Sequence, residues 1–313
     1  MKVKVGVVQD YPVFFDREKT LDKMESILSD NAGNGYQLMV FPESFIPGYP
    51  RGFTFGASVG KRSEAGKDLY ADYHDQSVDL KGKALKRLEE LSRAYQTYLV
   101  VGITERSAEH GSLFCSMLYI SPVKGLLGVH RKIKPTGTER VIWSEASGED
   151  LVTFETEIGK LGGLICWENY MPLARMAMYQ KGIEIYIAPT ADARESWVAS
   201  MRHIALEGRC FVLGCNQYIT RPMIPEKYQD MLTVEEEEEM CPGGSVIVSP
   251  SGEVLAGPLW NSSGIVSAII DLDDISRQKL DFDVNGHYSR KDIFEFRVNK
   301  QPDIYNEKKP PNG

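Results

Sequence analysis

The sequence predicts one large α/β domain. Apolar stretches of strand length alternate along the chain with amphipathic stretches of helical period, and pairs of strands in hairpins are interspersed among them. The order of strand, helix and strand ending in a polar residue recurs in both halves of the chain. Because no Pro-, Ser- or Gly-rich linker separates these halves, one domain accounts for the pattern better than two joined domains.

Composition excludes several classes of protein. The 313 residues, with 42% hydrophobic and 26% charged content, are enough to bury the core of a globular protein. The net charge of −8 argues against a nucleic-acid partner, which needs a basic surface. No apolar run reaches the roughly 18 residues of a membrane span, and the N-terminus starts an alternating strand rather than a signal peptide. Five cysteines without paired spacing are typical of a reducing compartment, so we expect a cytoplasmic protein.

The first half of the chain begins with a strand, since Val3, Val5 and Val7 alternate with less apolar residues. A helix follows over 17–31, and a short buried strand over 37–43 ends at Pro42. Residues 51–80 are rich in Gly, Ser, Asp and Tyr and predict a long loop that could hold short helices. The remaining pattern predicts a helix over 84–95 and strands over 98–104, 113–120 and 125–130.

The second half continues the alternation. We expect strands over 151–154, 161–166, 183–188, 211–216 and 264–272, a hairpin over 243–256 and helices over 173–180 and 198–209. The acidic run Glu235–Glu239 predicts a solvated loop, because no converging ligands suggest a metal site. Residues 281–313 show little periodicity and end in a loose tail.

Cys166 lies where the apolar run 161–166 gives way to a helical pattern, with Pro172 suited to the first helical turn. A cysteine at such a turn is held outward from the sheet. The N-terminus of the following helix favours negative charge, so we expect the pKa of this thiol to be lowered towards thiolate. The alternative is a small buried apolar residue, which is the usual state of a free cysteine.

Two other polar residues follow apolar strands, Glu43 and Lys132. A cysteine nucleophile needs a base for its proton and an electrophile for the negative charge that it creates, and Glu43 and Lys132 could supply them. Lys132 could equally belong to a solvated charge run, and His130 could serve as the partner of a cysteine. We interpret His203, inside a helical pattern, as a packed or surface residue.

Other chemistries lack their motifs. The chain has no Gly-x-Ser-x-Gly turn, no Gly-x-Gly-x-x-Gly or phosphate-binding loop, and no metal-ligand spacing among its five histidines. These patterns favour a cysteine hydrolase or transferase without a cofactor or metal, and they leave the bond that it cleaves undetermined.

The segments that carry these residues resemble the nitrilase superfamily, and within it the nitrilase branch. The resemblance covers residues 3–298 in five ordered blocks: Phe41-Pro-Glu-Ser-Phe-Ile-Pro-Gly-Tyr-Pro50; His130-Arg-Lys-Ile-Lys-Pro-Thr136 with Thr138-Glu-Arg140 and Trp143; Cys166-Trp-Glu-Asn-Tyr170; Gly243-Gly-Ser-Val-Ile-Val-Ser-Pro250; and Asp281-Phe-Asp-Val-Asn-Gly-His-Tyr-Ser-Arg290. It implies a four-layer α-β-β-α sandwich, one domain over 1–298 with a tail over 299–313, and a homodimer or larger homo-oligomer.

The resemblance also assigns roles. It implies that Cys166 is the nucleophile, Glu43 the general base, Lys132 the stabiliser of negative charge and Glu139 the second glutamate, which orients the lysine. A small-molecule nitrile and water would then give a carboxylic acid and ammonia through a thioimidate and a thioester, or an amide if the thiol leaves first. Hydrolysis of amide or carbamoyl groups, degradation of free cyanide, and a binding protein that has lost activity are the alternatives.

The sequence departs from the branch after Trp143, where Ser144–Asp150 replaces a Gly-rich turn, and at the acidic run. The chain also stops soon after the last block, which favours dimers over long filaments. Residues that flank the motifs are candidates for the wall of the substrate pocket, although each could equally belong to the core: Tyr49, Pro50, Thr136, Trp143, Trp167 and Ala191.

Overall fold

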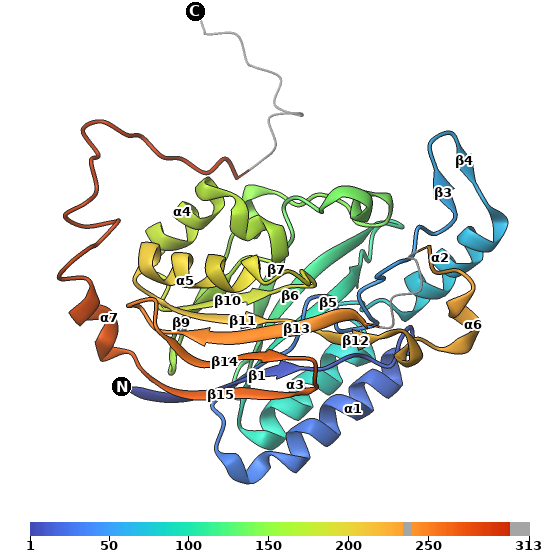
Figure 1. The fold of residues 1–313 in the computed structure, drawn as a ribbon, viewed down its shortest axis with the longest axis horizontal. Helices are drawn as coiled ribbons and strands as arrows, with labels where there is room; N and C mark the ends of the chain where they lie inside the picture. Colours follow the sequence, from blue (N-terminus) through green and yellow to red (C-terminus); the bar gives the residue numbers. More distant parts are fainter. Residues whose placement is uncertain (234–238, 301–313) are drawn as a thin grey trace, which may run out of the picture.

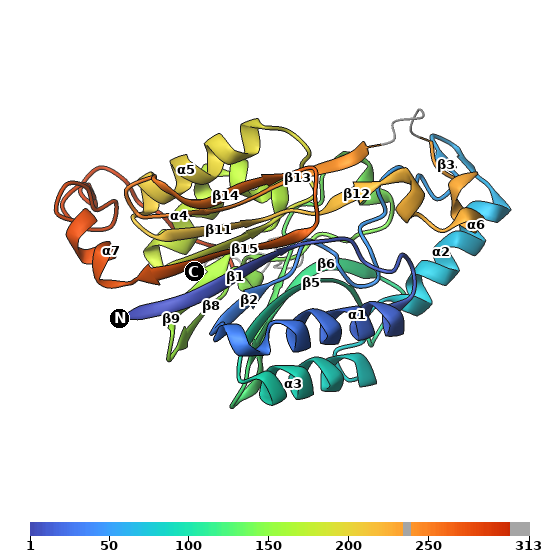
Figure 2. The ribbon, with the colours of Figure 1, turned by 60° about the horizontal axis from the view of Figure 1, so that its bottom comes forward.

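The computed structural model describes residues 1–233 and 239–300. Two β-sheets lie face to face, and helices cover the outer side of each (Figure 1). Figure 2 shows the same layers from another side, with α1 and α3 beneath one sheet and α4 and α5 beyond the other. This arrangement is the four-layer α-β-β-α sandwich that the family resemblance implies.

The first sheet has, within the described residues, the strand order β15-β1-β2-β5-β6-β7. Its central strands β1, β2 and β5 are parallel, whereas β15, β6 and β7 join by antiparallel pairing. Val3, Val5 and Val7 face the core between the sheets, which confirms the predicted alternation. The strands are β1 (Lys2–Gln9), β2 (Leu38–Val40), β5 (Tyr98–Arg106), β6 (Leu113–Ser121), β7 (Gly125–Arg131) and β15 (Gly264–Asp271).

The second sheet repeats this plan with the order β12-β13-β11-β10-β9-β8, and β14 pairs with β13. Its central strands β9, β10 and β11 are parallel. The predicted hairpin is confirmed, since β13 and β14 pair antiparallel around residues 249–253. The strands are β8 (Thr153–Thr156), β9 (Gly159–Gly163), β10 (Ile185–Pro189), β11 (Phe211–Cys215), β12 (Tyr218–Thr220), β13 (Glu239–Val248) and β14 (Val254–Trp260).

Helices pack on the outer face of each sheet through one apolar stripe. Leu21 and Leu88 bring α1 and α3 onto the first sheet, and Met178 and Met201 bring α4 and α5 onto the second. The helices are α1 (Arg17–Asp30), α2 (Glu64–Gln76), α3 (Lys83–Tyr95), α4 (Pro172–Gln180), α5 (Ser196–Gly208), α6 (Glu226–Gln229) and α7 (Asp273–Gln278), with short 3₁₀ helices η1 (Ala32–Asn34), η2 (Gly137–Val141), η3 (Gly148–Asp150), η4 (Cys166–Tyr170) and η5 (Arg221–Met223).

The long loop predicted over 51–80 is wrong in part, because it contains the 13-residue helix α2 and a small hairpin of β3 (Ala57–Ser58) and β4 (Lys61–Arg62). Ser63 caps the helix through the N–H of Gly66, and Leu69 and Tyr73 bury one face of it. Those signals were present in the sequence, but the polar composition of the segment obscured them.

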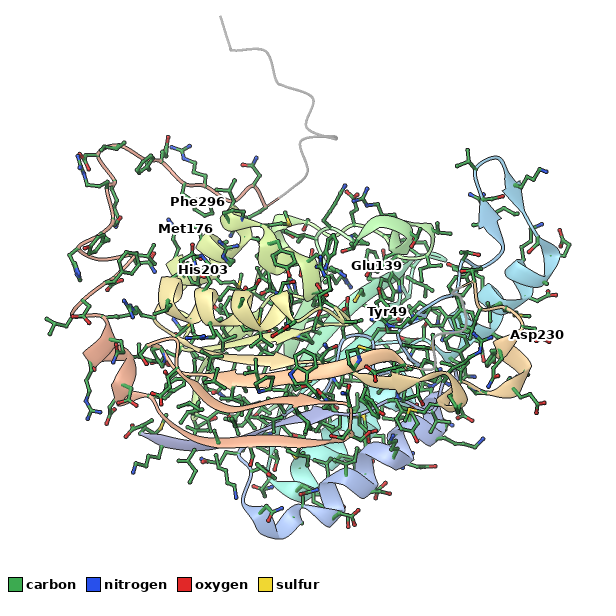
Figure 3. The ribbon with its side chains drawn as sticks, viewed as in Figure 1. Tyr49, Glu139, Met176, His203, Asp230 and Phe296 are labelled. Carbon is green, nitrogen blue, oxygen red and sulfur yellow. The ribbon has the colours of Figure 1, made fainter. Side chains whose placement is uncertain are left out.

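The C-terminal part of the described chain is irregular after α7, as predicted. It nevertheless packs on the body, since Val284, Phe296 and Val298 join the apolar cluster beneath α4 and α5. Figure 3 labels Phe296 beside Met176 of α4. The domain boundary at residue 298 stays a prediction. Of the acidic run, Glu239 begins β13, whereas residues 235–238 and most of the tail over 299–313 lie outside the described residues.

Candidate active site

Glu43 lies between the two sheets and is fully buried. We expected it at the end of a strand, but β2 stops at Val40, three residues earlier. The turn that follows places Ser44 in the left-handed region with φ of 47°. The side chain of Gln217 fixes the backbone here by donating from Nε2 to the carbonyl oxygen of Glu43 at 2.6 Å. The backbone of Glu43 is therefore held by the side chain of Gln217 rather than by strand pairing.

Lys132 follows β7 directly, and its side chain is buried rather than solvated. Its Nζ donates to Oε1 of Glu43 at 2.7 Å and to Oε2 of Glu139 at 2.8 Å. The backbone N–H of Lys132 donates to the carbonyl oxygen of Cys115 on β6. The surface interpretation of this lysine is thus wrong. An ammonium between two carboxylates at such distances forms charge-assisted hydrogen bonds that fix its position.

Glu139 belongs to the short helix η2 and is bound on both of its oxygens. Besides Lys132, the backbone N–H of Thr136 donates to Oε2 at 2.6 Å, and the hydroxyl of Tyr49 donates to Oε1 at 2.7 Å. Figure 3 labels Tyr49 and Glu139 close together in the interior. The family resemblance named Glu139, which lies in this cluster, but it did not indicate that Tyr49 and Thr136 would hold it.

Cys166 starts the short helix η4, three residues after β9 ends. Its φ of 51° lies in the left-handed region, which residues with a Cβ seldom adopt. Glycine at position 163 lets the chain before Cys166 pass close to β10, because a Cβ there would lie 1.8 Å from the carbonyl oxygen of Ile187. The hydroxyl of Thr190, just after β10, donates to Sγ at 3.1 Å. This sulfur is buried beside the Glu43 and Lys132 cluster.

Burial and neighbouring charges together shift the pKa values of these groups. Burial raises the pKa of Glu43, and the charge of Glu139 raises it further. The Lys132 ammonium lowers it, but the pKa stays above its ordinary value of 4.5. Burial alone would lower the pKa of Lys132, but the charges of Glu43, Cys166 and Glu139 outweigh it and hold the pKa well above 10.5. The lysine is therefore an ammonium.

The expectation of a thiolate stabilised by a helix N-terminus is wrong. Burial and the charge of Glu43 raise the pKa of the Cys166 thiol, although Lys132 and Thr190 act in the opposite direction. The helix α4 does begin with Pro172 in its first turn, as predicted, but it begins six residues after the sulfur. The resting thiol consequently keeps its proton and needs a base to remove it.

The structure adds residues to this cluster that the sequence did not single out. Thr190 contacts the sulfur, and the thiol of Cys115 lies 3.5 Å from Oε1 of Glu43. Oε2 of Glu43 has no hydrogen-bond partner among the described residues, so it is the oxygen with free capacity to accept a proton. No sequence motif marks these positions, because an isolated threonine or cysteine after an apolar run is usually part of the core.

The predicted pocket residues divide into those beside Glu139 and Lys132 and those that contact Asp192 or Arg51. Tyr49 and Thr136 are engaged with Glu139, and the ring of the buried Trp143 packs edge-on against Tyr49, with Nζ of Lys132 5.9 Å from the Trp143 centroid. Trp167 is 43% exposed and donates from Nε1 to Asp192 at 2.9 Å. Ala191 is buried, and its carbonyl oxygen accepts a hydrogen bond from the side chain of Arg51.

The two histidines that we considered lie elsewhere. His130 bonds Oε2 of Glu168 through Nε2 at 2.9 Å, so it is engaged with a carboxylate rather than with Cys166. His203 lies on α5 and is exposed, which confirms its interpretation as a packed or surface residue (Figure 3). Among the described residues, no cluster of histidine, cysteine, aspartate and glutamate side chains could hold a metal ion. No helix in that part of the chain is both long and apolar enough to cross a membrane.

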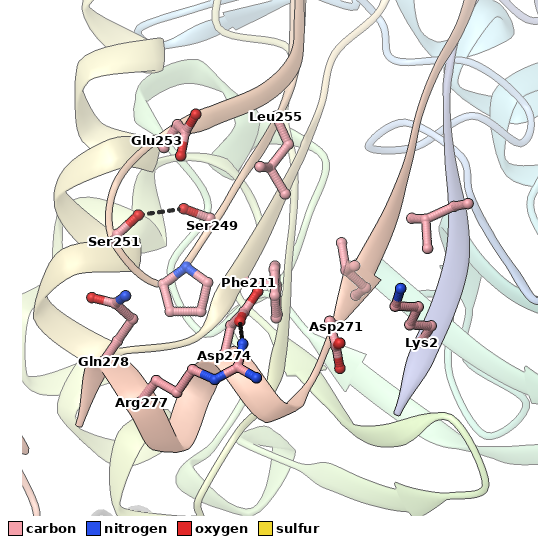
Figure 4. A pocket seen from close by; sticks show the side chains of 13 residues that line it. Lys2, Phe211, Ser249, Ser251, Glu253, Leu255, Asp271, Asp274, Arg277 and Gln278 are labelled. Atoms are coloured by element: carbon pink, nitrogen blue, oxygen red, sulfur yellow. Dashed lines mark hydrogen bonds and ion pairs between the residues drawn. The ribbon is translucent and has the colours of Figure 1, made fainter. Parts of the chain in front are cut away.

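A separate cavity of about 590 Å³ opens at one end of the sandwich, between β1, β15, α7 and the turn of the β13–β14 hairpin. Figure 4 shows its polar lining, in which Arg277 pairs with Asp274 and Ser249 bonds Ser251. Neither Cys166 nor any residue bonded to Lys132 lines it. It is therefore not the site that the motifs form.

The chain is similar to known proteins over most of its length. The family described as carbon-nitrogen hydrolase matches residues 4–279. The bifunctional nitrilase/nitrile hydratase NIT4A of Lupinus angustifolius is 48% identical over 305 residues, covering 96% of this chain and 87% of that protein. An aliphatic nitrilase of Sinorhizobium fredii is 45% identical over 301 residues, covering 96% of this chain and 97% of that protein.

Solved structures show the same fold at lower sequence identity. A carbon-nitrogen hydrolase from Helicobacter pylori G27 superposes with a TM-score of 0.74 at 21% identity, covering 94% of this chain and 97% of that chain. Nit3 of Saccharomyces cerevisiae, a member of the nitrilase superfamily, superposes with a TM-score of 0.69 at 19% identity and covers the same shares. The family match and the close relatives together show that this chain belongs to the carbon-nitrogen hydrolase family.

Proposed function

We propose that the protein hydrolyses an organic nitrile to the carboxylic acid and ammonia. The observation that carries this proposal is the buried ammonium of Lys132, held between Glu43 and Glu139 beside the thiol of Cys166. Such a site has a nucleophile, a base and a fixed positive charge, which are the groups that addition to a carbon–nitrogen bond needs. The names of the relatives, nitrilases at 45–48% identity, also support it.

The first stage of the proposed reaction forms a thioimidate. Glu43 accepts the thiol proton of Cys166, and the sulfur attacks the nitrile carbon. The nitrile nitrogen gains the electron pair of the broken π bond, and Lys132 stabilises that negative charge until the nitrogen is protonated. The backbone N–H of Trp167 is a second candidate donor to this nitrogen. The raised pKa of Glu43 suits it to hold the thiol proton for this transfer.

The second stage consumes two waters. The first adds to the thioimidate carbon, and the tetrahedral intermediate expels ammonia to leave a thioester on Cys166. A second water, deprotonated by Glu43, attacks the thioester and releases the carboxylic acid with return of the thiol. In this scheme Glu139 orients Lys132 and helps to position water.

An amide is the second candidate product. The tetrahedral intermediate can expel the thiol of Cys166 instead of ammonia, and the substrate then leaves as an amide. The observation in favour is that relatives such as the one from Lupinus angustifolius are named as both nitrilase and nitrile hydratase. Hydrolysis of amide or carbamoyl substrates and of free cyanide would use the same groups, so these compounds belong in the test.

The test is a panel of aliphatic, aryl and arylalkyl nitriles, the matching amides and free cyanide, with ammonia, acid and amide each quantified. We expect acid and ammonia from at least one nitrile. Turnover of amides with none of any nitrile would contradict the proposal. Cys166→Ala should abolish product formation. Cys210→Ala is the matched control, because Cys210 is an equally buried free thiol in the cluster beneath α4 and α5.

We also propose that the pocket wall includes the residues named from the motifs. Trp167 is the strongest candidate, because nearly half of its surface stays free of the protein. Tyr49, Thr136, Trp143 and Ala191 would shape the same cavity near Lys132 and Thr190. Trp167→Ala should change the ranking of the nitriles in the panel, measured as kcat/KM for each. An unchanged ranking would remove Trp167 from the pocket.

We further propose a homodimer or larger homo-oligomer in the cytoplasm. Exposed apolar side chains gather on η4, α4 and α5, where Leu173 is 70% exposed, and this supports an interface. Five free thiols support a reducing compartment. Light scattering of the purified protein should give at least twice the mass of 35.1 kDa, and Leu173→Glu should lower it. A monomer at micromolar concentration would contradict the first proposal, and cell fractionation tests the second.

A further inference from the structure

The carboxylate of Glu168 contacts the backbone on both sides of the active site. It is 1% exposed, and its Oε2 accepts from the N–H of Ile165 at 2.7 Å while its Oε1 accepts from the N–H of Ile133 at 2.7 Å. Ile165 directly precedes Cys166, and Ile133 directly follows Lys132. One side chain therefore binds the residue next to the sulfur and the residue next to the ammonium.

These two segments need such a contact because they come from different sheets. Lys132 follows β7, the last strand of the first sheet in the described order, whereas Cys166 follows β9 in the second sheet. Strand pairing fixes positions within a sheet but not between two sheets packed through side chains. The two hydrogen bonds of Glu168 connect the backbones of these segments directly.

His130 supplies the opposite charge. Its Nδ1 lies 2.7 Å from the carbonyl oxygen of Asp150, which can only accept, so Nδ1 carries a proton. Its Nε2 faces Oε2 of Glu168 at 2.9 Å. Burial alone would lower the pKa of His130, but the charge and hydrogen bond of Glu168 raise it above 6.5, which favours the protonated ring that donates from both nitrogens. Since His130 lies two residues before Lys132, this pair also ties the lysine segment to Glu168.

We propose that Glu168 is a positioning residue, which aligns the thiol of Cys166 with the ammonium of Lys132 by holding the backbone beside each of them. The proposal rests on the proposed function for the roles of those two groups. A displacement of about 1 Å between reacting groups can reduce a rate by about 100-fold. Glu168 need not touch the substrate to control the reaction in this way.

The decisive variant is Glu168→Asp, which keeps the charge opposite His130 but shortens the side chain by one carbon, about 1.5 Å. The aspartate cannot then reach the N–H groups of Ile133 and Ile165 together within hydrogen-bond distance. Glu168→Gln, which keeps the length but loses the charge and one acceptor, is the second variant. Glu184→Gln is the matched control, because Glu184 also accepts a backbone N–H, that of Lys160 at 2.8 Å, near the opposite ends of β9 and β10.

Two measurements on each variant separate positioning from folding. The first is kcat and KM on a nitrile that the wild type converts, normalised to the folded fraction from near-UV circular dichroism. The second is the rate of Cys166 alkylation by iodoacetamide against pH, read by peptide mass mapping. The alkylation measurement needs no turnover, so it tests the alignment of Cys166 even if the protein hydrolyses no nitrile. In that case only the proposed function fails.

We expect Glu168→Asp to lower kcat about 10- to 100-fold with KM within about twofold, and to shift the pH midpoint of Cys166 alkylation. Glu184→Gln should match the wild type in both measurements. The proposal is overturned if Glu168→Asp lowers only the melting temperature, or if Glu184→Gln shows the same kinetic loss. If Glu168→Gln does not fold, Glu168→Asp decides alone, since it retains the charge opposite His130.

Discussion

The hydrogen bond from Thr190 to the sulfur gives the sharpest test of the site. The hydroxyl oxygen of Thr190 accepts from the N–H of Asp192 at 2.9 Å, and its proton points to Sγ of Cys166 at 3.1 Å. As the thiol loses its proton, this bond becomes a hydrogen bond to an anion. We therefore expect the bond to strengthen during the attack on the substrate, so that it lowers the barrier.

The size of the effect follows from the bond type. A hydrogen bond to a charged group contributes about 1.5–3 kcal/mol, and about 1.4 kcal/mol corresponds to a tenfold change in rate. Thr190→Val keeps the shape but removes the hydroxyl, so kcat should fall about 10- to 100-fold. The unpaired N–H of Asp192 should also lower the free energy of unfolding by about 1–3 kcal/mol.

The assay combines ammonia release from a converted nitrile with the pH dependence of Cys166 alkylation. Thr190→Val should move the alkylation midpoint to higher pH, because this hydroxyl lowers the pKa of the thiol in the wild type. Thr190→Ser keeps the hydroxyl and should stay within about threefold of the wild type. A folded Thr190→Val protein with unchanged kcat and an unchanged alkylation midpoint would refute the reasoning.

Three further predictions concern neighbouring groups. Tyr49→Phe removes the 2.7 Å bond to Glu139 and should lower kcat about 3- to 10-fold, and steady-state kinetics with no loss would contradict this. The acid limb of kcat/KM against pH should lie above pH 4.5, because the proposed base Glu43 must be deprotonated and its pKa is raised. A limb at or below pH 4.5 would contradict this. The raised pKa of His130 predicts that the free energy of unfolding of the wild type falls as the pH rises above 6.5. Urea denaturation of His130→Gln should show a smaller fall over the same pH range, and an unchanged slope would contradict this.

The sign of that last prediction follows from the pair. Burial alone would lower the pKa of His130, but the charge and hydrogen bond of Glu168 outweigh it and raise the pKa above 6.5. A group whose pKa is higher in the folded state stabilises the protein fully below its unfolded pKa. That stabilisation is lost as the pH rises through the folded pKa.

Much of the fold could be predicted because periodicity reports burial directly. The alternation of Val3, Val5 and Val7 and the apolar stripes of α1 and α3 appear in the structure where the sequence placed them. The helix α2 was missed because its polar composition resembles a loop, although Ser63, Leu69 and Tyr73 carry a cap and a buried face. Composition averages over a segment, whereas a helix needs only one apolar face.

The site was predictable only in part. Glu43, Lys132, Glu139 and Cys166 stand in recognisable motifs, and the structure brings the first three into direct contact. The protonation of the thiol could not be predicted, because it depends on burial and on the charge of a residue 123 positions away in the chain. Thr190 reaches the sulfur from the neighbouring strand of the same sheet, and Glu168 connects segments that follow strands of different sheets. No local sequence pattern records either contact.

The backbone of Cys166 carries a further consequence. A residue with a Cβ in the left-handed region costs about 1–2 kcal/mol relative to glycine, and the φ of Cys166 is 51°. Glycine would relieve this backbone strain, but it would lose the buried sulfur and the contact of that sulfur with Thr190. The order of stability should therefore be Cys166→Gly above Cys166→Ala. Selection for thermal stability alone does not retain the sulfur, so a screen for robust variants must also score turnover.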